Sequence, residues 1–374
     1  MRNPERILRA LAGIAGLLFA ASAFAAGSCR IVFDMGSSGI RAGASGSETI
    51  LRADIDYLAP LWAGRGLDEL VAPTIAALVA LPRQGGFADD CVRVAGGFSA
   101  WRLALQQNAG SLVANLSRIK AASGTSLLVI PQNVEGTYGY LGARQLLGNR
   151  LASSHILDIG GGSLQIAGEY TSFGDALGQK IWHRELCRMI RRTEAQPCRL
   201  QPLPVDDVAA ARALASERLK GVRAALGGPV TMTAISRPVT QGVVPAVARL
   251  LDQRFGQDPL PLSALSAAIE MLAGLTPDQV PARLEMPQKY AAYLLSDMLL
   301  LEGLMQAAGG EPLRFAELDL TNLPGLLADE QAFGWAGNYG CYLERLALLG
   351  LQAYASDPAS CAAVSTPDVV PRGN

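Results

Sequence analysis

Two short glycine-rich stretches decide the expected fold: Asp34-Met35-Gly36-Ser37-Ser38-Gly39-Ile40-Arg41 and Asp158-Ile159-Gly160-Gly161-Gly162-Ser163. Each follows a short apolar run, begins with Asp, and leads into a second strand-like run. Their leading aspartates are separated by about the length of one domain. We therefore predict an internal duplication, in which one strand–turn–strand hairpin opens each of two lobes.

The composition of both turns suits phosphate binding. Turns without bulky side chains expose backbone N–H groups that can surround a phosphate. The candidate phosphate-binding residues are Gly36, Ser37, Ser38, Arg41, Gly160, Gly161, Gly162 and Ser163. The alternative is a pair of plain β-hairpins that need glycine only for backbone geometry. Because two such turns occur, each led by Asp at a strand end, we favour the phosphate interpretation.

The leading aspartates are candidate metal residues. Asp34 and Asp158 should meet across a cleft between the lobes, since both stand at strand ends. Two carboxylates there suit a divalent cation held mostly through water, as Mg²⁺ prefers. The sequence therefore predicts a cation-dependent phosphate site.

Strand signals alternate with helical segments along the chain, which indicates an α/β protein with a mostly parallel sheet in each lobe. We predict a signal peptide at 1–25, a first lobe at 26–150, a second lobe at 151–335, and a C-terminal helix and tail at 336–374.

The first 25 residues have the features of an export signal. A positive start is followed by the apolar run Leu11–Phe19 and by Ala23-Phe24-Ala25, a small-x-small cleavage motif. A membrane anchor is the alternative, but the apolar run is too short to span a bilayer comfortably. We expect cleavage after Ala25, a periplasmic or secreted product, and no stable membrane insertion.

The cysteine count agrees with export. All six cysteines follow the expected cleavage site, and an even count in an oxidising compartment favours three disulfides. Cys187/Cys198 and Cys341/Cys361 are close in sequence, whereas Cys29 and Cys91 each precede a strand-like run and would meet if those strands are parallel neighbours. A zinc site has little support, since the sequence contains no Cys-x-x-Cys pair.

Composition excludes several classes of protein. Of the 374 residues, 50% are hydrophobic and 17% charged, which excludes a disordered chain. The net charge of −1 gives no basic field for general nucleic-acid binding. With only two histidines, a multi-histidine metal site is excluded.

The two turns resemble the phosphate motifs of the exopolyphosphatase/guanosine-pentaphosphate phosphatase (Ppx/GppA) family and of the related apyrase-type nucleotidases. The segment Val134–Gly142 is similar to the one that carries their catalytic glutamate, here Glu135. The resemblance implies two actin-like (ribonuclease H-like) lobes with a cleft between them. It also implies divalent-cation-dependent hydrolysis of polyphosphate, (p)ppGpp or nucleoside polyphosphates, or apyrase-like hydrolysis of nucleoside tri- and diphosphates.

One segment departs from the family pattern. Val94–Arg102 lacks the family's threonine and has extra residues before Arg102, which is therefore only a possible phosphate ligand. A non-catalytic protein that binds a phosphate ligand is the alternative.

Glu135 is the candidate for orienting the attacking water, because it follows the Leu127–Ile130 strand that should end at the cleft. Its plainer interpretation is a carboxylate at a helix N-terminus.

Overall fold

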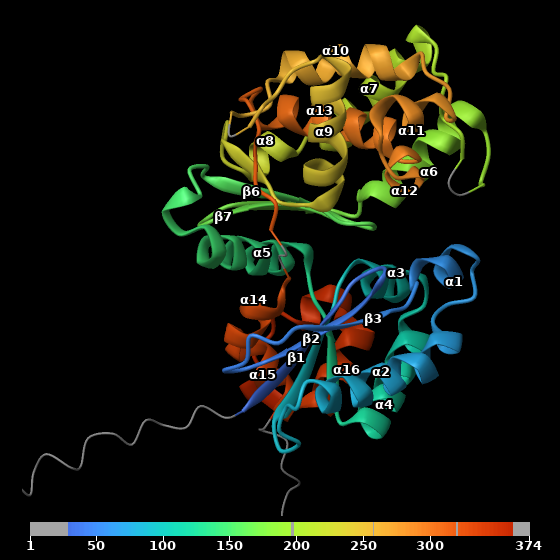
Figure 1. Cartoon of the computed structure of the whole chain (residues 1–374). Coiled ribbons are helices and arrows are strands. Elements are labelled where there is room, and N and C mark those ends of the chain that lie inside the picture. Colours follow the sequence, from blue (N-terminus) through green and yellow to red (C-terminus); the bar gives the residue numbers. More distant parts are fainter. Residues whose placement is uncertain (1–28, 196–197, 257, 319–320, 362–374) are drawn as a thin grey trace, which may run out of the picture.

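The computed structural model describes residues 29–195, 198–256, 258–318 and 321–361, which form two lobes joined at a waist (Figure 1). The predicted signal peptide lies outside these residues. Each lobe contains a five-stranded sheet, with strand orders β3-β2-β1-β4-β5 and β10-β9-β6-β7-β8. The predicted two-lobed α/β fold is confirmed.

Both sheets are built in the same way around the predicted hairpins. The strands of the first sheet are β1 (Arg30–Met35), β2 (Gly39–Ala44), β3 (Leu51–Asp54), β4 (Val92–Gly97) and β5 (Ser126–Val129). Those of the second are β6 (His155–Ile159), β7 (Leu164–Gly168), β8 (Ser172–Asp175), β9 (Met232–Ala234) and β10 (Arg314–Phe315). In the strand register of the two hairpins, Asp34 lies opposite Arg41 and Asp158 lies opposite Gln165. The duplication therefore extends to the register of the strands.

The prediction of mostly parallel sheets is wrong. In each sheet the hairpin continues into a third antiparallel strand, β3 or β8, and only the strands on the other side of β1 or β6 are parallel. Two of the four pairings in each sheet are therefore antiparallel, because a short turn can return the chain without a crossover helix.

The first lobe is completed by the C-terminal part of the chain. Its helices are α1 (Leu58–Trp62), α2 (Val71–Gln84), α3 (Ser99–Gln107), α4 (Ala109–Ser123), α14 (Leu323–Ala328), α15 (Glu330–Gly337) and α16 (Tyr339–Leu349). Leu323, Leu326 and Trp335 are buried in the same core as the strands β1 and β4. The predicted boundary at residue 335 is therefore misplaced, since α14 and α15 pack on the first lobe. Their apolar residues fit that core. The sequence carries no signal that the chain returns to the first lobe before α14.

Helix α5 (Gln132–Leu147) lies between the two sheets (Figure 1). Its Tyr140 and Ala143 pack with Ile156 of the second sheet, whereas Tyr138 belongs to the core of the first lobe. The helix therefore joins the lobes, and its first turn opens at the waist.

The second lobe is dominated by helices around one apolar element. Its helices are α6 (Gln179–Leu186), α7 (Val205–Leu219), α8 (Val222–Ala225), α9 (Val244–Leu250), α10 (Leu262–Ala273), α11 (Gln279–Leu284), α12 (Gln288–Ala291) and α13 (Leu294–Ala308). Helix α13 is buried along almost its whole length and packs against α6, α7 and α10. Shorter helical turns are η2 (Asp68–Leu70), η3 (Gly148–Arg150), η4 (Cys187–Arg191), η5 (Pro238–Val243), η6 (Gly350–Ala353) and η7 (Pro358–Cys361).

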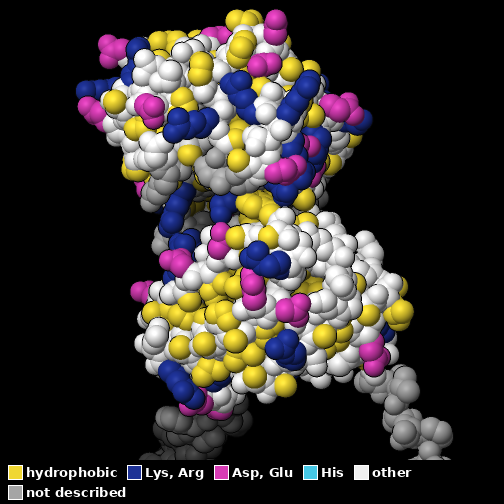
Figure 2. Space-filling view, turned by 90° about the vertical axis from the view of Figure 1, so that its right-hand side faces the viewer, with side chains coloured by type: hydrophobic (Ala, Val, Ile, Leu, Met, Phe, Trp, Pro, Cys, Tyr) yellow, Lys and Arg dark blue, Asp and Glu magenta, His cyan; other side chains and the backbone are white. Residues whose placement is uncertain are grey.

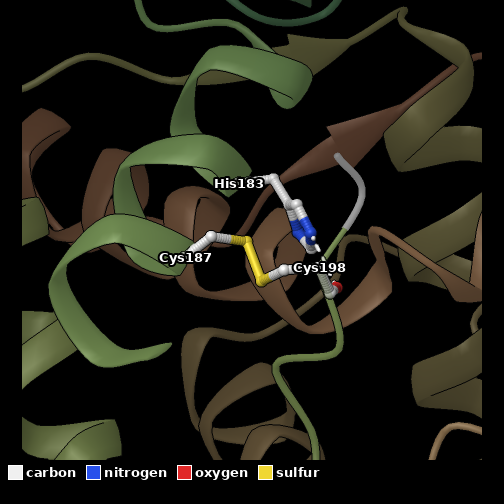
Figure 3. A group of neighbouring side chains, drawn as sticks. All are labelled: His183, Cys187 and Cys198. Carbon is white, nitrogen blue, oxygen red and sulfur yellow. Dashed lines mark hydrogen bonds between the residues drawn. A yellow bond between two sulfur atoms is a disulfide. The ribbon is translucent and has the colours of Figure 1, made fainter. Parts of the chain in front are cut away.

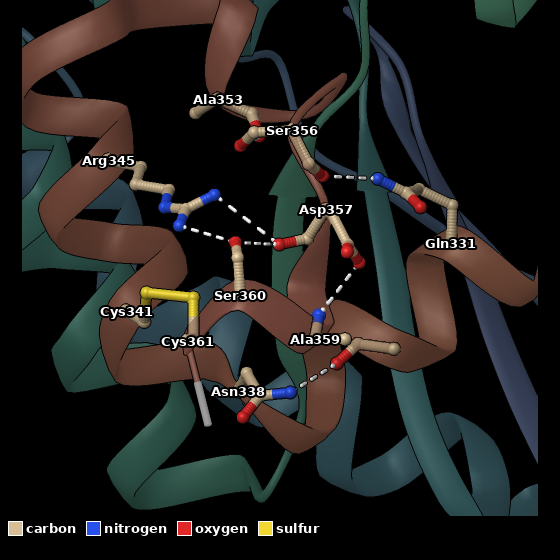
Figure 4. The surroundings of a disulfide bond; sticks show 11 residues. Gln331, Asn338, Cys341, Arg345, Ala353, Ser356, Asp357, Ala359, Ser360 and Cys361 are labelled. Carbon is tan, nitrogen blue, oxygen red and sulfur yellow. Dashed lines mark hydrogen bonds between the residues drawn. A yellow bond between two sulfur atoms is a disulfide. The ribbon is translucent and has the colours of Figure 1, made fainter. Parts of the chain in front are cut away.

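All three predicted disulfides form, and none joins the lobes. Cys29–Cys91 links the starts of β1 and β4, which are parallel neighbours with Arg30 opposite Val92. Cys187–Cys198 closes a loop in the second lobe, and Cys341–Cys361 ties η7 to α16, where Arg345 also donates to Ser360 (Figure 4). Each lobe is thus cross-linked internally.

No helix in the described part of the chain combines the length and apolar character needed to cross a bilayer.

The returning C-terminal segment should be essential to the first lobe's stability. Trp335 is fully buried and its Nε1–H donates to the Tyr354 carbonyl at 3.1 Å. Trp335→Ala should lower the free energy of unfolding by about 3–5 kcal/mol, whereas Leu348→Ala should change it by less than about 0.5 kcal/mol, because Leu348 is 82% exposed. Urea denaturation measures both, and equal effects would contradict this packing.

Candidate active site

The two glycine turns and Glu135 line one cavity of about 170 Å³ at the waist. The predicted residues in its wall are Asp34, Gly36, Ser37, Ser38, Arg41, Glu135, Gly160, Gly161 and Ser163. Lys and Arg side chains also lie along the waist, where the molecule narrows between the lobes (Figure 2). Residues far apart in the sequence therefore form a single site.

The turns approach each other so closely that side chains would block them. A Cβ on Gly161 would lie 2.7 Å from the Ser37 hydroxyl of the other turn. Gly162 is buried behind the turn, where a Cβ would lie 2.9 Å from the Ser99 hydroxyl. It is not part of the cavity wall, and its predicted role in phosphate binding stays a prediction. Glycine is thus required at both positions for the lobes to meet.

Glu135 lies in the first turn of α5 with its side chain only 12% exposed. Its Oε2 accepts hydrogen bonds from Arg102 Nη2 at 2.7 Å and from Gln165 Nε2 at 3.0 Å. Two donors on one oxygen fix the orientation of the carboxylate. They leave Oε1 to accept a hydrogen bond from a molecule in the cavity.

Arg102 lies behind Glu135 and not in the cavity wall. It is 2% exposed, and its guanidinium donates to the Ile130 carbonyl at 2.8 Å and to Ser163 Oγ at 3.0 Å as well as to Glu135. The extra residues before Arg102 form the first turn of α3, which directs this side chain beneath α5. Arg102 therefore holds Glu135 and the second turn, and its possible contact with phosphate stays a prediction.

Three carboxyls share this buried region, and burial raises the pKa of each. The pKa of Asp34 is raised despite the opposing charge of Arg41, and that of Glu135 despite Arg102. Burial, together with repulsion from Glu135 and Asp34, raises the pKa of Asp158 to about 7. The site therefore has excess negative charge that a cation would neutralise.

The carboxyls suit a loosely held cation better than a closed metal cage. No three carboxylates among the described residues lie close enough together to chelate an ion directly. Mg²⁺ usually takes one or two protein carboxylates and completes its shell with water and phosphate oxygens. Asp34 and Asp158 fit that pattern.

A second chamber of about 340 Å³ continues from the first along the turns. Asp158 lies in its wall together with Arg41, Arg52, Lys180 and Arg237. The chamber has more positive than negative side chains.

The first residues of helix α6 hold the second glycine turn through backbone hydrogen bonds. The backbone N–H groups of Gln179 and Lys180 donate to the carbonyls of Gly160 and Gly161, both at 2.9 Å. These bonds orient the turn's peptide units in the cleft.

Two residues of the site were not predicted from the sequence. Gln165 stands opposite Asp158 just as Arg41 stands opposite Asp34, so the duplication itself could have pointed to it. Asn322 reaches the cavity from the returning C-terminal segment, and its backbone N–H donates to Asp34 Oδ2 at 3.1 Å. A backbone contact of this kind leaves no signal in the sequence.

No protein-family profile matches the sequence, and a search of curated proteins also finds no match. Among solved structures, a Ppx/GppA family member from Aquifex aeolicus is similar, with 16% identity over 80% of this chain and 96% of that one and a TM-score of 0.58. An exopolyphosphatase from Cytophaga hutchinsonii gives 15% identity over 80% and 96%, with a TM-score of 0.55.

The chain shares the fold of the Ppx/GppA structures. The resemblance inferred from the motifs is thus confirmed in three dimensions. At this identity the likeness establishes the fold, and the activity is argued from the cavity.

The raised pKa of Asp158 should make stability depend on pH. The folded state binds a proton at Asp158 up to about pH 7, whereas the unfolded chain releases it near the ordinary carboxyl pKa. The stability of the metal-free protein, relative to Asp158→Asn, should therefore fall from about pH 4 to pH 8. Thermal unfolding of both proteins in chelator across this range measures the difference, and parallel profiles would show that Asp158 titrates normally.

Proposed function

We propose that the protein is an exported hydrolase that releases the terminal phosphate from a phosphoanhydride chain, with a divalent cation. One observation carries this proposal: two glycine turns suited to phosphate and a held glutamate line the same cavity. Hydrolysis of a phosphoanhydride needs these parts, because phosphate must be positioned and a water aligned opposite the leaving group.

Glu135 orients the water. Its carboxylate is fixed through Oε2, so Oε1 accepts a hydrogen bond from a water in the cavity and aligns it with the terminal phosphorus. The raised pKa of Glu135 brings it closer to the working pH of a proton acceptor. Arg102 and Gln165 act as positioning residues.

The two turns bind the terminal phosphates. Backbone N–H groups of the turns and the hydroxyls of Ser37, Ser38 and Ser163 donate to phosphate oxygens. Arg41 adds a positive charge from the strand opposite Asp34. A cation near Asp34 and Asp158, most simply Mg²⁺, would neutralise charge on the phosphates and relieve the repulsion between the carboxyls.

The second chamber favours a long polyanion as substrate. Lys180 and Arg237 line the second chamber, and Arg52 lines both chambers, so the three suit successive phosphates. Polyphosphate is therefore our first choice, which agrees with the exopolyphosphatase name of one structural neighbour. Nucleoside polyphosphates and (p)ppGpp carry the same phosphate groups at one end.

The proposed location is the periplasm or the exterior. The sequence begins with the features of a cleavable signal, and the three disulfides are of the kind that oxidising compartments permit.

Release of inorganic phosphate tests the function directly. The purified mature chain should be incubated with long-chain polyphosphate, ATP, ADP, GTP and ppGpp, with Mg²⁺ or with chelator. We expect Mg²⁺-dependent release that is fastest from polyphosphate. Fastest release from ATP and ADP would instead support an apyrase-like activity, and binding of polyphosphate without release from any substrate would identify a non-catalytic binder.

Glu135→Gln should abolish turnover but leave substrate binding nearly unchanged. The amide keeps the shape of the side chain and removes the charge that aligns the water, so kcat should fall on the order of 10²–10⁴-fold. Glu169→Gln is the matched control, because Glu169 is exposed and pairs only loosely with Arg144 at 3.8 Å. Retention of most activity in Glu135→Gln would assign water orientation to another group.

Asp34→Ala and Asp158→Ala should each raise the Mg²⁺ concentration needed for half-maximal activity, because each removes a carboxylate near the cation. Asp206→Ala provides the control, since Asp206 is exposed in the first turn of α7 and lines neither chamber. Activity titrated against Mg²⁺ at saturating substrate measures the effect. Identical titration curves in all four proteins would exclude both aspartates as metal residues.

Lys180→Ala should raise KM for long-chain polyphosphate by about tenfold, the loss expected for one charge-assisted hydrogen bond. It should change KM for a short phosphate chain much less, because a short chain held at the turns does not extend along the second chamber to the Lys180 ammonium. Lys220→Ala is the control, since Lys220 is exposed and pairs with Glu217. An equal effect on long and short chains would contradict our assignment of the chamber.

A further inference from the structure

A second cluster of chemically active side chains lies away from the cleft, in the core of the second lobe. His183, Cys187 and Cys198 are buried there, and their ligand-type atoms all lie within 4.8 Å of one another (Figure 3). Among the described residues this is the one group of at least three such side chains. The proposed hydrolysis does not use it.

The local structure brings the three side chains to one point. His183 and Cys187 are four residues apart at the end of α6, so they lie on the same helical face. Cys187 opens the π-helical turn η4, and such turns often occur at functional sites. Cys198 is joined to Cys187 by the disulfide and is buried in the same core as Leu200 and Leu203.

The position of the imidazole is fixed by neighbours. Its Nδ1 lies 2.9 Å from Ser296 Oγ, and its Nε2 lies 3.2 Å from the Cys198 carbonyl. The ring is 1% exposed and contacts Tyr293 edge-on, with ring centroids 4.9 Å apart. The contacts with Ser296 and Tyr293 do not involve the two cysteines, so they hold the ring beside the sulfur atoms without the disulfide.

We propose that this cluster is a redox-controlled zinc site. A dithiol reduces the Cys187–Cys198 disulfide and is itself oxidised to a disulfide, which leaves two thiols beside His183. One Zn²⁺ then binds two thiolate sulfurs and one imidazole nitrogen and releases the two thiol protons. Water takes the fourth position, as in three-ligand protein zinc sites.

The spacing fits this ligand set. With Zn–S about 2.3 Å and Zn–N about 2.0 Å, tetrahedral ligands lie about 3.5–3.8 Å apart. The separations here are at most 4.8 Å, and the Cα atoms of the two cysteines are 6.0 Å apart. Two changes are needed: the sulfur atoms must separate, and the imidazole nitrogen that binds zinc must give up its present partner, either the Cys198 carbonyl or Ser296 Oγ.

Charge also fits a metal of +2 at this place. Without metal the two reduced cysteines stay neutral thiols, because a buried apolar core would not tolerate two thiolate charges. One Zn²⁺ allows both to ionise, since it neutralises the pair. Disulfide and zinc are then alternative cross-links between the end of α6 and the Cys198 segment.

The other two disulfides serve as internal controls. Neither Cys29–Cys91 nor Cys341–Cys361 forms part of a ligand cluster among the described residues. The remaining histidine, His155 at the start of β6, has its two ring nitrogens hydrogen-bonded to Ser154 and Thr171. Zinc should therefore distinguish the Cys187–Cys198 pair from the other four thiols.

The first experiment uses the unaltered chain. It is reduced with a dithiol under nitrogen, freed of the dithiol by gel filtration, and treated with a thiol-alkylating reagent with or without one equivalent of Zn²⁺. Mass spectrometry of the peptides gives the alkylation rate of each cysteine. We expect zinc to slow alkylation of Cys187 and Cys198 at least tenfold and to leave the other four unchanged.

The second experiment uses Co²⁺ as a spectroscopic probe. The reduced chain should show a tetrahedral cobalt spectrum with a thiolate charge-transfer band, which Zn²⁺ abolishes at one equivalent. The variant Cys341→Ser/Cys361→Ser should keep this spectrum, whereas Cys187→Ser/Cys198→Ser should lose it and His183→Asn should bind at least tenfold more weakly. The oxidised chain should show none.

Several results would overturn the proposal. They are equal protection of all six cysteines, protection of none, a cobalt spectrum that survives in Cys187→Ser/Cys198→Ser, and His183→Asn affinity equal to that of the unaltered chain. Loss of the near-ultraviolet circular dichroism on reduction, without recovery on adding Zn²⁺, would also overturn it.

Discussion

The rest of the site depends on the hydrogen bonds that the buried guanidinium of Arg102 donates. It donates to the end of a first-lobe strand at Ile130, to Glu135 on α5, and to Ser163 in the second turn. Its charge also opposes the rise in the pKa of Glu135 that burial causes. This single side chain therefore joins the lobes and also supports the glutamate. Removing one partner of a buried ion pair typically lowers the free energy of unfolding by about 3–5 kcal/mol.

No disulfide links the two lobes to each other. Each disulfide closes a loop within one lobe, and α5 and the returning segment before α14 carry the chain across the waist. In the proposed mechanism, closure around phosphates depends on the close approach of the two turns at Gly161 and Ser37, which no covalent bond restrains. Such an arrangement allows the cleft to open for substrate and product.

Local patterns were predictable from the sequence, whereas long-range partners were not. The hairpins follow from an Asp-led glycine turn between apolar runs, and Cys29–Cys91 follows from two parallel strand starts. The return of α14 and α15 to the first lobe was missed, because an apolar helix does not specify which core receives it. Gln165 was missed because a neutral amide carries no obvious chemistry until it is found 3.0 Å from Glu135.

The most direct test of the account is the fate of the oxygen from water. Our central claim is that water, oriented by Glu135, attacks the terminal phosphorus. Turnover of polyphosphate in ¹⁸O-labelled water should then place a single labelled oxygen in each released phosphate and none in the shortened chain. Label in the shortened chain, or release of unlabelled phosphate, would contradict the account.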